Sequence, residues 1–119
     1  MNRLRLVFAG SPQAAVPSLI DLVASRHDVA AVITREDSPQ GRRRQLAPTA
    51  VASAAIDAGI PVIRANRLSA EISERVAELE PDLGVIVAYG VLVREPLLST
   101  PRLGWINLHF SSLPRWRGE

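Results

Sequence analysis

The fold class follows first from the sequence LRLVFAGSP at residues 4–12. Its apolar run, Leu4 to Ala9, predicts a short buried strand that ends at Gly10. Ser11 and Pro12 then offer a helix cap and a first-turn proline, so we expect the strand to lead directly into a helix. The apolar face of that helix is expected at Val16, Leu19, Ile20 and Val23.

The same alternation of short strands and helices continues along the chain. Further strands are expected at 29–34, 60–63, 83–88 and 105–109, helices at 49–58 and 69–80, a charged loop at 35–46 and a helical turn at 96–99. Five apolar strands alternating with helices predict an α/β fold of the doubly wound type, with a mostly parallel sheet covered on both faces. With 119 residues, 47% of them hydrophobic, we expect one domain or part of one.

Composition excludes several chemistries. The chain has no cysteine, and its only histidines are His27 and His109, so no metal site is expected. All 14 basic residues are arginine, which excludes Schiff-base lysines and the lysine of nucleotide-binding P-loops. No apolar stretch approaches the roughly 20 residues that cross a bilayer, so we expect no membrane segment and a cytoplasmic location.

Ligands of doubly wound sheets bind at the carboxyl ends of the strands. The residues expected there are Gly10, Arg35, Tyr89 with Gly90, and Asn107 to Phe110. Gly10 stands alone, so the dinucleotide-binding glycine pattern is missing. Tyr89 has two interpretations, an aromatic surface for a flat ligand or ordinary core at the sheet edge.

Asn107 and His109 form the sharpest chemical pair. They lie two residues apart in a strand, so their side chains point the same way. A histidine can accept a proton near neutral pH, and an asparagine amide can donate to a developing oxyanion, as acyl transfer requires. The alternative is a buried histidine that uses the asparagine as its hydrogen-bond partner. His27, beside Asp28, is expected to have only a role at a helix end.

Three consecutive arginines, Arg42, Arg43 and Arg44, occupy the charged loop. Such a loop is too polar to bury, and it would face the ligand edge of the sheet. It is therefore either a phosphate-binding element or an ordinary solvated run of charge.

The sequence NLHFSSLPRWRG at 107–118 resembles the signature of formyltransferases that use 10-formyltetrahydrofolate. The resemblance extends to FAGSP at 8–12, AVP at 15–17, VAYG at 87–90 and the loop from Pro39 to Pro48. The loop and the VAYG segment are most similar to the branch of that family that formylates methionyl-tRNA.

The resemblance implies a Rossmann-like formyltransferase domain with no metal, monomeric in its complete form. It assigns Asn107 and His109 to catalysis and the triple arginine, Arg42, Arg43 and Arg44, to the acceptor end of the methionyl initiator tRNA. The implied folate pocket is lined by Tyr89, Gly90, Val91, Leu92, Ser111, Ser112, Leu113 and Pro114. Relatives of this kind also have a catalytic aspartate and a carboxyl-terminal tRNA-binding domain, to which nothing in residues 1–119 corresponds. We therefore expect a partial domain, inactive alone.

Three residues depart from the family pattern. Ser112 stands in place of a leucine, Phe110 in place of a small residue, and Arg43 in place of a glycine that would adopt positive φ freely. Two alternatives follow: a formyltransferase for another amine, such as a sugar nucleotide or glycinamide ribotide, or a folate-binding module without catalysis. The arginine loop argues against the first.

Overall fold

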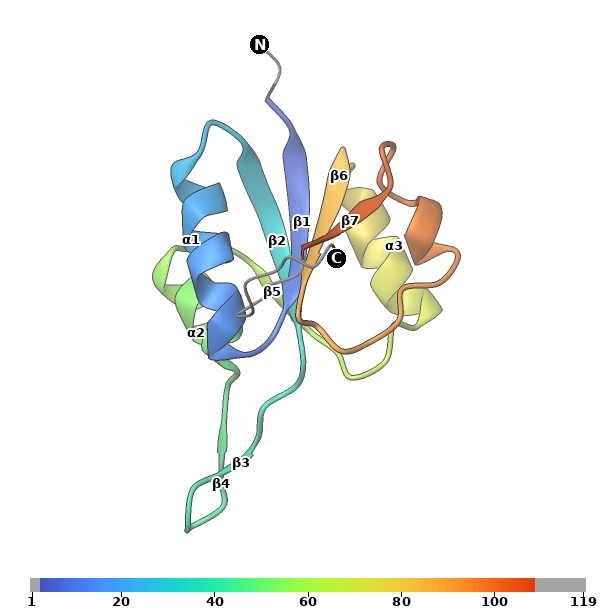
Figure 1. Ribbon diagram of the computed structural model, residues 1–119. Helices are drawn as coiled ribbons and strands as arrows, with labels where there is room; N and C mark the ends of the chain where they lie inside the picture. Colours follow the sequence, from blue (N-terminus) through green and yellow to red (C-terminus); the bar gives the residue numbers. More distant parts are fainter. Residues whose placement is uncertain (1–2, 109–119) are drawn as a thin grey trace, which may run out of the picture.

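A computed structural model describes residues 3–108, and its centre is a five-stranded sheet (Figure 1). The strands are β1 (Arg5–Gly10), β2 (Asp28–Thr34), β5 (Val62–Arg64), β6 (Leu83–Val87) and β7 (Trp105–Leu108). Their order is β5-β2-β1-β6-β7, and every neighbouring pair is parallel. The predicted doubly wound α/β class is confirmed, because the chain builds outward from β1 first on one side and then on the other.

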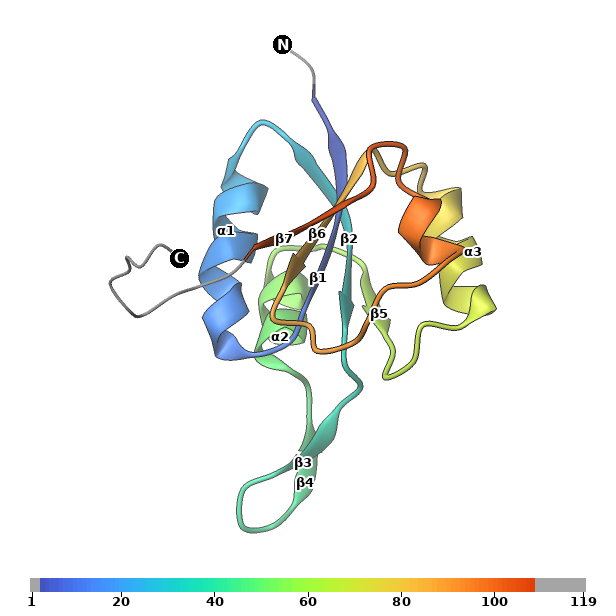
Figure 2. The same ribbon diagram turned by 45° about the vertical axis from the view of Figure 1, so that its right-hand side comes forward.

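Helices cover both faces of the sheet (Figures 1 and 2). One face packs against α1 (Val16–Ala24) and α2 (Ala50–Asp57), and the other packs against α3 (Ala70–Glu78) and the 3₁₀ turn η2 (Leu97–Ser99). Side chains alternate along β1, so Phe8 is buried under the first layer and Val7 and Ala9 under the second. Each face of the sheet therefore has its own apolar core.

Two predicted helix starts are confirmed in detail. Thr49 caps α2, since its Oγ1 accepts a hydrogen bond from the Ala52 N–H at 3.0 Å. Ser69 caps α3 in the same way, with its Oγ 3.4 Å from the Ile72 nitrogen. Substituting such a cap typically costs about 1 kcal/mol of stability.

The start of the first helix differs from the prediction. A 3₁₀ turn, η1 (Gln13–Ala15), follows β1, and α1 begins only at Val16, with Pro17 in its first turn. Pro17 takes the place expected for Pro12, and no side chain caps either element. Ser11 does not cap because its hydroxyl binds elsewhere, to Thr34 and to the backbone N–H of Arg35.

The apolar face predicted for α1 is only half buried. Val16 and Leu19 are 8% and 1% exposed, whereas Ile20 and Val23 are 55% and 40% exposed. The outer strand β7 likewise exposes Ile106. Apolar side chains of α1 and β7 are therefore exposed on the face of the sheet that α1 and α2 cover, among the described residues.

The charged loop contains a hairpin that the sequence did not predict. Strands β3 (Ser38–Gln40) and β4 (Gln45–Ala47) pair antiparallel and project from the carboxyl end of the sheet (Figure 1). At its tip, Gly41 and Arg44 adopt positive φ, at 70° and 54°. The expected difficulty at Arg43 does not arise, because the left-handed positions fall on its neighbours.

The amino end of the sheet is closed by polar contacts. The Asp82 carboxylate accepts from the Arg5 backbone N–H at 2.8 Å and from the Arg102 guanidinium at 2.7 Å. His27 follows α1, and its Nδ1 accepts a hydrogen bond from the Leu4 N–H at 3.0 Å, which joins this end of the helix to the start of β1. No helix among residues 3–108 is long and apolar enough to cross a membrane.

Candidate functional site

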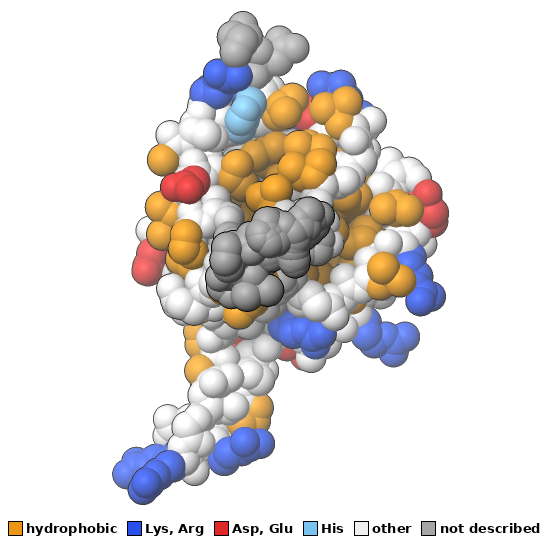
Figure 3. All heavy atoms as spheres, viewed as in Figure 1, with side chains coloured by type: hydrophobic (Ala, Val, Ile, Leu, Met, Phe, Trp, Pro, Cys, Tyr) orange, Lys and Arg blue, Asp and Glu red, His pale blue; other side chains and the backbone are white. Residues whose placement is uncertain are grey.

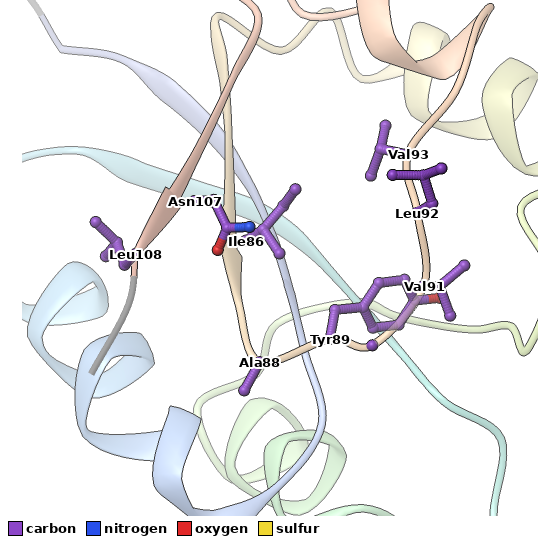
Figure 4. Close-up of a pocket in the computed structure, with 9 residues that line it drawn as sticks. Ile86, Ala88, Tyr89, Val91, Leu92, Val93, Asn107 and Leu108 are labelled. Atoms are coloured by element: carbon purple, nitrogen blue, oxygen red, sulfur yellow. The ribbon is translucent and has the colours of Figure 1, made fainter. Parts of the chain in front are cut away.

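The first cavity lies where β6 and β7 end (Figure 4). It has a volume of about 520 Å³, and we call it the sheet-edge cavity; it is lined by Ile86, Ala88, Tyr89, Gly90, Val91, Leu92, Val93, Asn107 and Leu108. Ligand pockets usually measure about 300–1,000 Å³, so this cavity is large enough for a ring system. Most of its lining is apolar, and the polar groups come from Asn107 and the loop backbone.

Asn107 is the catalytic candidate that the structure describes. It lies opposite Ile86 in the pairing of β6 and β7, and it is exposed. Its amide points toward Ile86 and the loop that carries Val91 to Val93, whereas Leu108 points the other way (Figure 4). Its expected partner His109, and the expected folate residues Ser111, Ser112, Leu113 and Pro114, lie outside the described residues.

The loop after β6 presents its backbone to the cavity. Ala88 and Gly90 adopt positive φ, 53° and 85°. Between them Tyr89 is 2% exposed, and its hydroxyl donates a hydrogen bond to the Ala65 carbonyl at 2.8 Å. Burial raises the pKa of the Tyr89 phenol, with the charge of Arg35 opposing that change. The Tyr89 ring is therefore core, which favours the second of its two interpretations, and the loop offers mainly backbone groups to a ligand.

Arg35 joins two strand ends. It follows β2, and its guanidinium Nη2 donates to the Gly90 carbonyl at 3.1 Å, so the end of β2 is tied to the loop after β6. Sequence reasoning placed Arg35 at the ligand edge but gave it no role. Its contact with Gly90 spans 55 residues, and no local pattern predicts it.

A second cavity adjoins the first at the root of the hairpin. Its volume is about 450 Å³, and we call it the hairpin-root cavity; it is lined by Ser11, Pro12, Gln13, Arg35, Gln40, Pro48, Thr49, Ala50, Ala88 and Tyr89. Ala88 and Tyr89 line both cavities. Its lining includes hydroxyl, amide and guanidinium groups beside apolar ones, and none of the described carboxylates lines it. Sequence reasoning missed it because its residues come from five separate segments.

Arg42, Arg43 and Arg44 form the tip of the hairpin (Figure 3). All three are exposed, and no ion pair among residues 3–108 involves them. Their charge is thus available to a partner outside the described chain. The described part contains no group of three acidic or histidine side chains that could hold a metal ion.

Comparison with known proteins gives close relatives. The chain is 67% identical over 115 residues to the methionyl-tRNA formyltransferase of Leifsonia xyli subsp. xyli, and 65% identical over 115 residues to that of Clavibacter michiganensis subsp. michiganensis. Each match covers 97% of this chain and 38% of the relative. The chain therefore spans well under half the length of these relatives.

Two solved structures share the fold. They are glycinamide ribonucleotide transformylase 1 from Symbiobacterium toebii and from Geobacillus kaustophilus, each with a TM-score of 0.62 and 22% identity. The matches cover 94% and 95% of this chain and 54% and 61% of those chains. At this identity the likeness supports the Rossmann-like fold alone.

The model of a family described as formyl transferase matches residues 4–119. This match covers nearly the whole chain, and the chain belongs to the formyl transferase family.

Proposed function

We propose that this chain is part of an enzyme that transfers the formyl group of 10-formyltetrahydrofolate to the α-amine of methionyl-tRNA. The observation that carries the proposal is the position of the arginine hairpin, which projects from the same carboxyl edge of the sheet that holds the cavity with Asn107. The close relatives that are named methionyl-tRNA formyltransferase support the proposal. The product would be the initiator formylmethionyl-tRNA, made in the cytoplasm.

In this reaction the substrate supplies its own nucleophile. The methionyl amine attacks the formyl carbon, a new N–C bond forms, the bond to N10 of the folate breaks, and the amine proton leaves. We assign Asn107 to hydrogen bonding with the negative charge that develops on the formyl oxygen. We assign His109 to the transfer of protons from the amine toward the leaving folate nitrogen.

We propose that the sheet-edge cavity receives the folate ring. Ile86 and Val93 would flank a flat ring, while backbone groups of the loop, held by Arg35 through Gly90, would bind its polar edge. The residues Ser111, Ser112, Leu113 and Pro114 would complete this pocket on the side of β7. The donor needs no metal, since the formyl carbon is already electrophilic.

The triple arginine would bind the phosphates of the tRNA acceptor end. Arginine contacts with phosphate position a nucleic acid without reading its sequence. The hairpin therefore supplies affinity for tRNA, while the cavity supplies the chemistry. The chain itself would form the first part of the formyltransferase domain, and the rest of the domain and a separate tRNA-binding domain would act with it in a monomeric enzyme.

The test uses a chimera in which this chain replaces the 115 matching residues of the Leifsonia xyli enzyme. We expect the chimera to transfer labelled formyl from 10-formyltetrahydrofolate to methionyl-tRNA. His109→Ala should lower kcat about 10²- to 10⁴-fold, the usual contribution of a general acid–base group. The 119-residue chain alone should show no transfer.

Two results would contradict the proposal. A folded chimera that formylates glycinamide ribotide or a sugar nucleotide in place of methionyl-tRNA would indicate another acceptor. A folded chimera that binds the folate and transfers nothing would indicate a binding module. The thermal melt of the chimera, compared with that of the Leifsonia xyli enzyme, serves as the control for folding.

A further inference from the structure

The arginine hairpin is oriented by its root. Strands β3 and β4 form a separate two-stranded sheet, and the side-chain hydrogen bond of Gln40 stays within the hairpin, at Ser38. Among residues 3–108, the hairpin residues 38–47 form no hydrogen bond with another element. The direction in which the arginine tip points is therefore set by the residues on either side of the hairpin.

Two successive residues at the start of the hairpin have distant partners. The Glu36 N–H donates a hydrogen bond to Asn66 Oδ1 at 2.9 Å. The Asp37 carboxylate accepts one from Arg64 Nε at 3.0 Å. Arg64 is the last residue of β5, and Asn66 follows it in the next loop. We call these two contacts the hairpin anchor, because they fasten the start of the hairpin to the end of β5.

The segment on the other side of the anchor is firmly held. Ala65 lies between the two anchoring residues and is 4% exposed. Its N–H donates to the Thr34 carbonyl at 2.8 Å, and its carbonyl accepts from the Tyr89 hydroxyl at 2.8 Å. The end of β5 is thus bound to β2 and to the loop after β6, and the anchor connects the hairpin to a buried part of the carboxyl edge.

The length of the hairpin amplifies any change of angle at its root. An antiparallel strand rises about 3.4 Å per residue, so Arg42 lies roughly 17 Å from Asp37 along the hairpin. A rotation of about 10° at the root would then displace the tip by about 3 Å, as much as the whole length of a hydrogen bond. Contacts between the tip and phosphate therefore depend on the angle of the root.

Stability of the fold is a weaker explanation for the anchor. The Arg64 and Asp37 side chains are 40% and 36% exposed, and ion pairs at such exposure add little to the stability of a domain. Asn66 is also exposed. Neither Arg64 nor Asn66 lines the sheet-edge cavity or the hairpin-root cavity, so direct contact with a ligand in those cavities does not explain them either.

We propose that Asn66 and Arg64 are positioning residues for the acceptor. They hold the hairpin at the angle at which its arginine tip meets the tRNA phosphates while the methionyl group reaches Asn107. This inference rests on the proposed function, since it assigns the end of β5 a part in binding the same acceptor. It predicts that residues which touch neither substrate determine how well tRNA binds.

The first test measures the kinetics of Asn66→Ala and Arg64→Gln in the chimera. If loss of the anchor lowers the fraction of molecules with a correctly directed hairpin, KM for methionyl-tRNA rises by the inverse of that fraction. We expect a rise of about 2- to 10-fold for Asn66→Ala, within the factor that one neutral hydrogen bond supplies, and about 2-fold for Arg64→Gln. The kcat value, KM for the folate and the melting temperature should not change.

Arg67→Gln is the matched control for charge. Arg67 is exposed, lies three residues after Arg64 and forms no ion pair among residues 3–108. Its substitution removes the same positive charge from the same loop and leaves the anchor intact. KM for methionyl-tRNA should therefore stay at the value of the parent chimera.

A double-mutant cycle tests whether the anchor acts through the tip. The background variant replaces Arg42, Arg43 and Arg44 with glutamine, which removes the phosphate contacts of the hairpin. In this background Asn66→Ala should leave KM for methionyl-tRNA unchanged, because the angle of a neutral tip no longer matters. Additive effects would mean that Asn66 acts by another route, and they would overturn the proposal.

A distance measurement tests the orientation without any substrate. Spin labels on Arg43→Cys at the tip and Glu74→Cys in α3 report the position of the hairpin relative to the sheet, after any other cysteine of the chimera has been replaced. Both sites are exposed. Asn66→Ala should broaden the distribution of distances between the labels, and Arg67→Gln should leave it unchanged.

The outcomes separate this inference from the proposed function. If the parent chimera is folded and transfers no formyl group to methionyl-tRNA, the proposed function fails and this inference fails with it. If transfer is normal and the two anchor variants leave KM for methionyl-tRNA unchanged, only the inference fails. It also fails if Arg67→Gln raises that KM equally, or if KM rises while the distribution of label distances stays the same.

Discussion

The two ends of the sheet use polar groups in different ways. At the amino end, Asp82 accepts from Arg5 and Arg102, and its own backbone N–H donates to the Arg5 carbonyl at 2.8 Å. The His27 Nδ1 there accepts from a backbone N–H. At the carboxyl end, the exposed Asn107 amide lines the sheet-edge cavity, and the Arg35 guanidinium, which donates to the Gly90 carbonyl, lines the hairpin-root cavity.

This difference separates polar residues whose hydrogen bonds stay within the fold from those that are candidates for binding a ligand. The Asp82 carboxylate already accepts hydrogen bonds from two donors within the chain, so it gives no reason to propose a ligand there. The Asn107 amide and the Arg35 guanidinium, which line cavities, do give one. The contrast also follows from topology, because parallel strands direct successive loops to a common carboxyl edge.

Among the variants that compare the two ends of the sheet, the largest effect is expected from Asn107→Ala in the chimera. Removing one donor to a developing oxyanion typically lowers kcat about 10²- to 10³-fold. The melting temperature should stay the same, because Asn107 is exposed. Arg102→Gln at the opposite end is the control, and it should lower stability without changing kcat. A similar loss of kcat in both variants would remove the distinction between the two ends.

Gly10→Ala should destabilise the carboxyl end. A Cβ at this position would lie 2.6 Å from the Val87 carbonyl oxygen and 3.0 Å from Phe8 Cε2. The first of these atoms belongs to the backbone of the neighbouring strand and cannot rotate away. We expect a loss of about 1–3 kcal/mol in the free energy of unfolding, the usual cost of overpacking. Unchanged denaturant unfolding would show that β1 and β6 separate more easily than their pairing implies.

Arg42→Glu should weaken tRNA use by about tenfold in KM at low salt, with KM for the folate unchanged. Reversing one charge removes a phosphate contact and adds a repulsion, so the salt dependence of KM should also become shallower. Arg26→Glu is a matched control, since Arg26 is exposed next to His27 near the amino end. An equal effect at Arg26 would mean that net charge, rather than the hairpin, attracts the tRNA.

Asp82→Asn should give the smallest effect, a modest fall in melting temperature that depends on pH. The Arg5 backbone N–H and the Arg102 guanidinium hold the pKa of Asp82 below its usual value of 3.8. A carboxylate with a lowered folded-state pKa contributes stability above that value, and the contribution is lost as the pH falls through the lower folded pKa. The melting difference between Asp82→Asn and the parent should be present at pH 7 and shrink below about pH 4. A difference that is constant with pH would contradict this.

Strands and helices could be predicted from the sequence wherever local periodicity decides them. The starts of the helices near Thr49 and Ser69, the five strands and their parallel pairing were all predictable. The strand expected at 60–63 is instead β5 (Val62–Arg64), because Ile60 and Pro61 serve to connect α2 to the sheet. Ser11 shows the limit, since a serine before a proline matches a cap but finds a better partner in Thr34, 23 residues away.

The site could be predicted only in part. Asn107 was found because it follows from strand position, and the arginines were found from composition. The hairpin-root cavity and the Arg35 contact were not, because they depend on residues brought together across 24 to 55 positions. His109, Ser111, Ser112, Leu113 and Pro114 are assigned only by family resemblance, and their roles stay predictions.

The 2.6 Å contact between Thr34 and Thr49 joins the two ends of the hairpin segment. β2 is held on both sides in the sheet, and α2 is packed against it, so each end is secured without the 14 residues between them. Trypsin cuts after arginine, and the exposed tip is its natural target. One cut there would leave two polypeptides that stay assembled as one folded domain. A protease would therefore separate the two strands of the hairpin from each other at the tip without unfolding the domain.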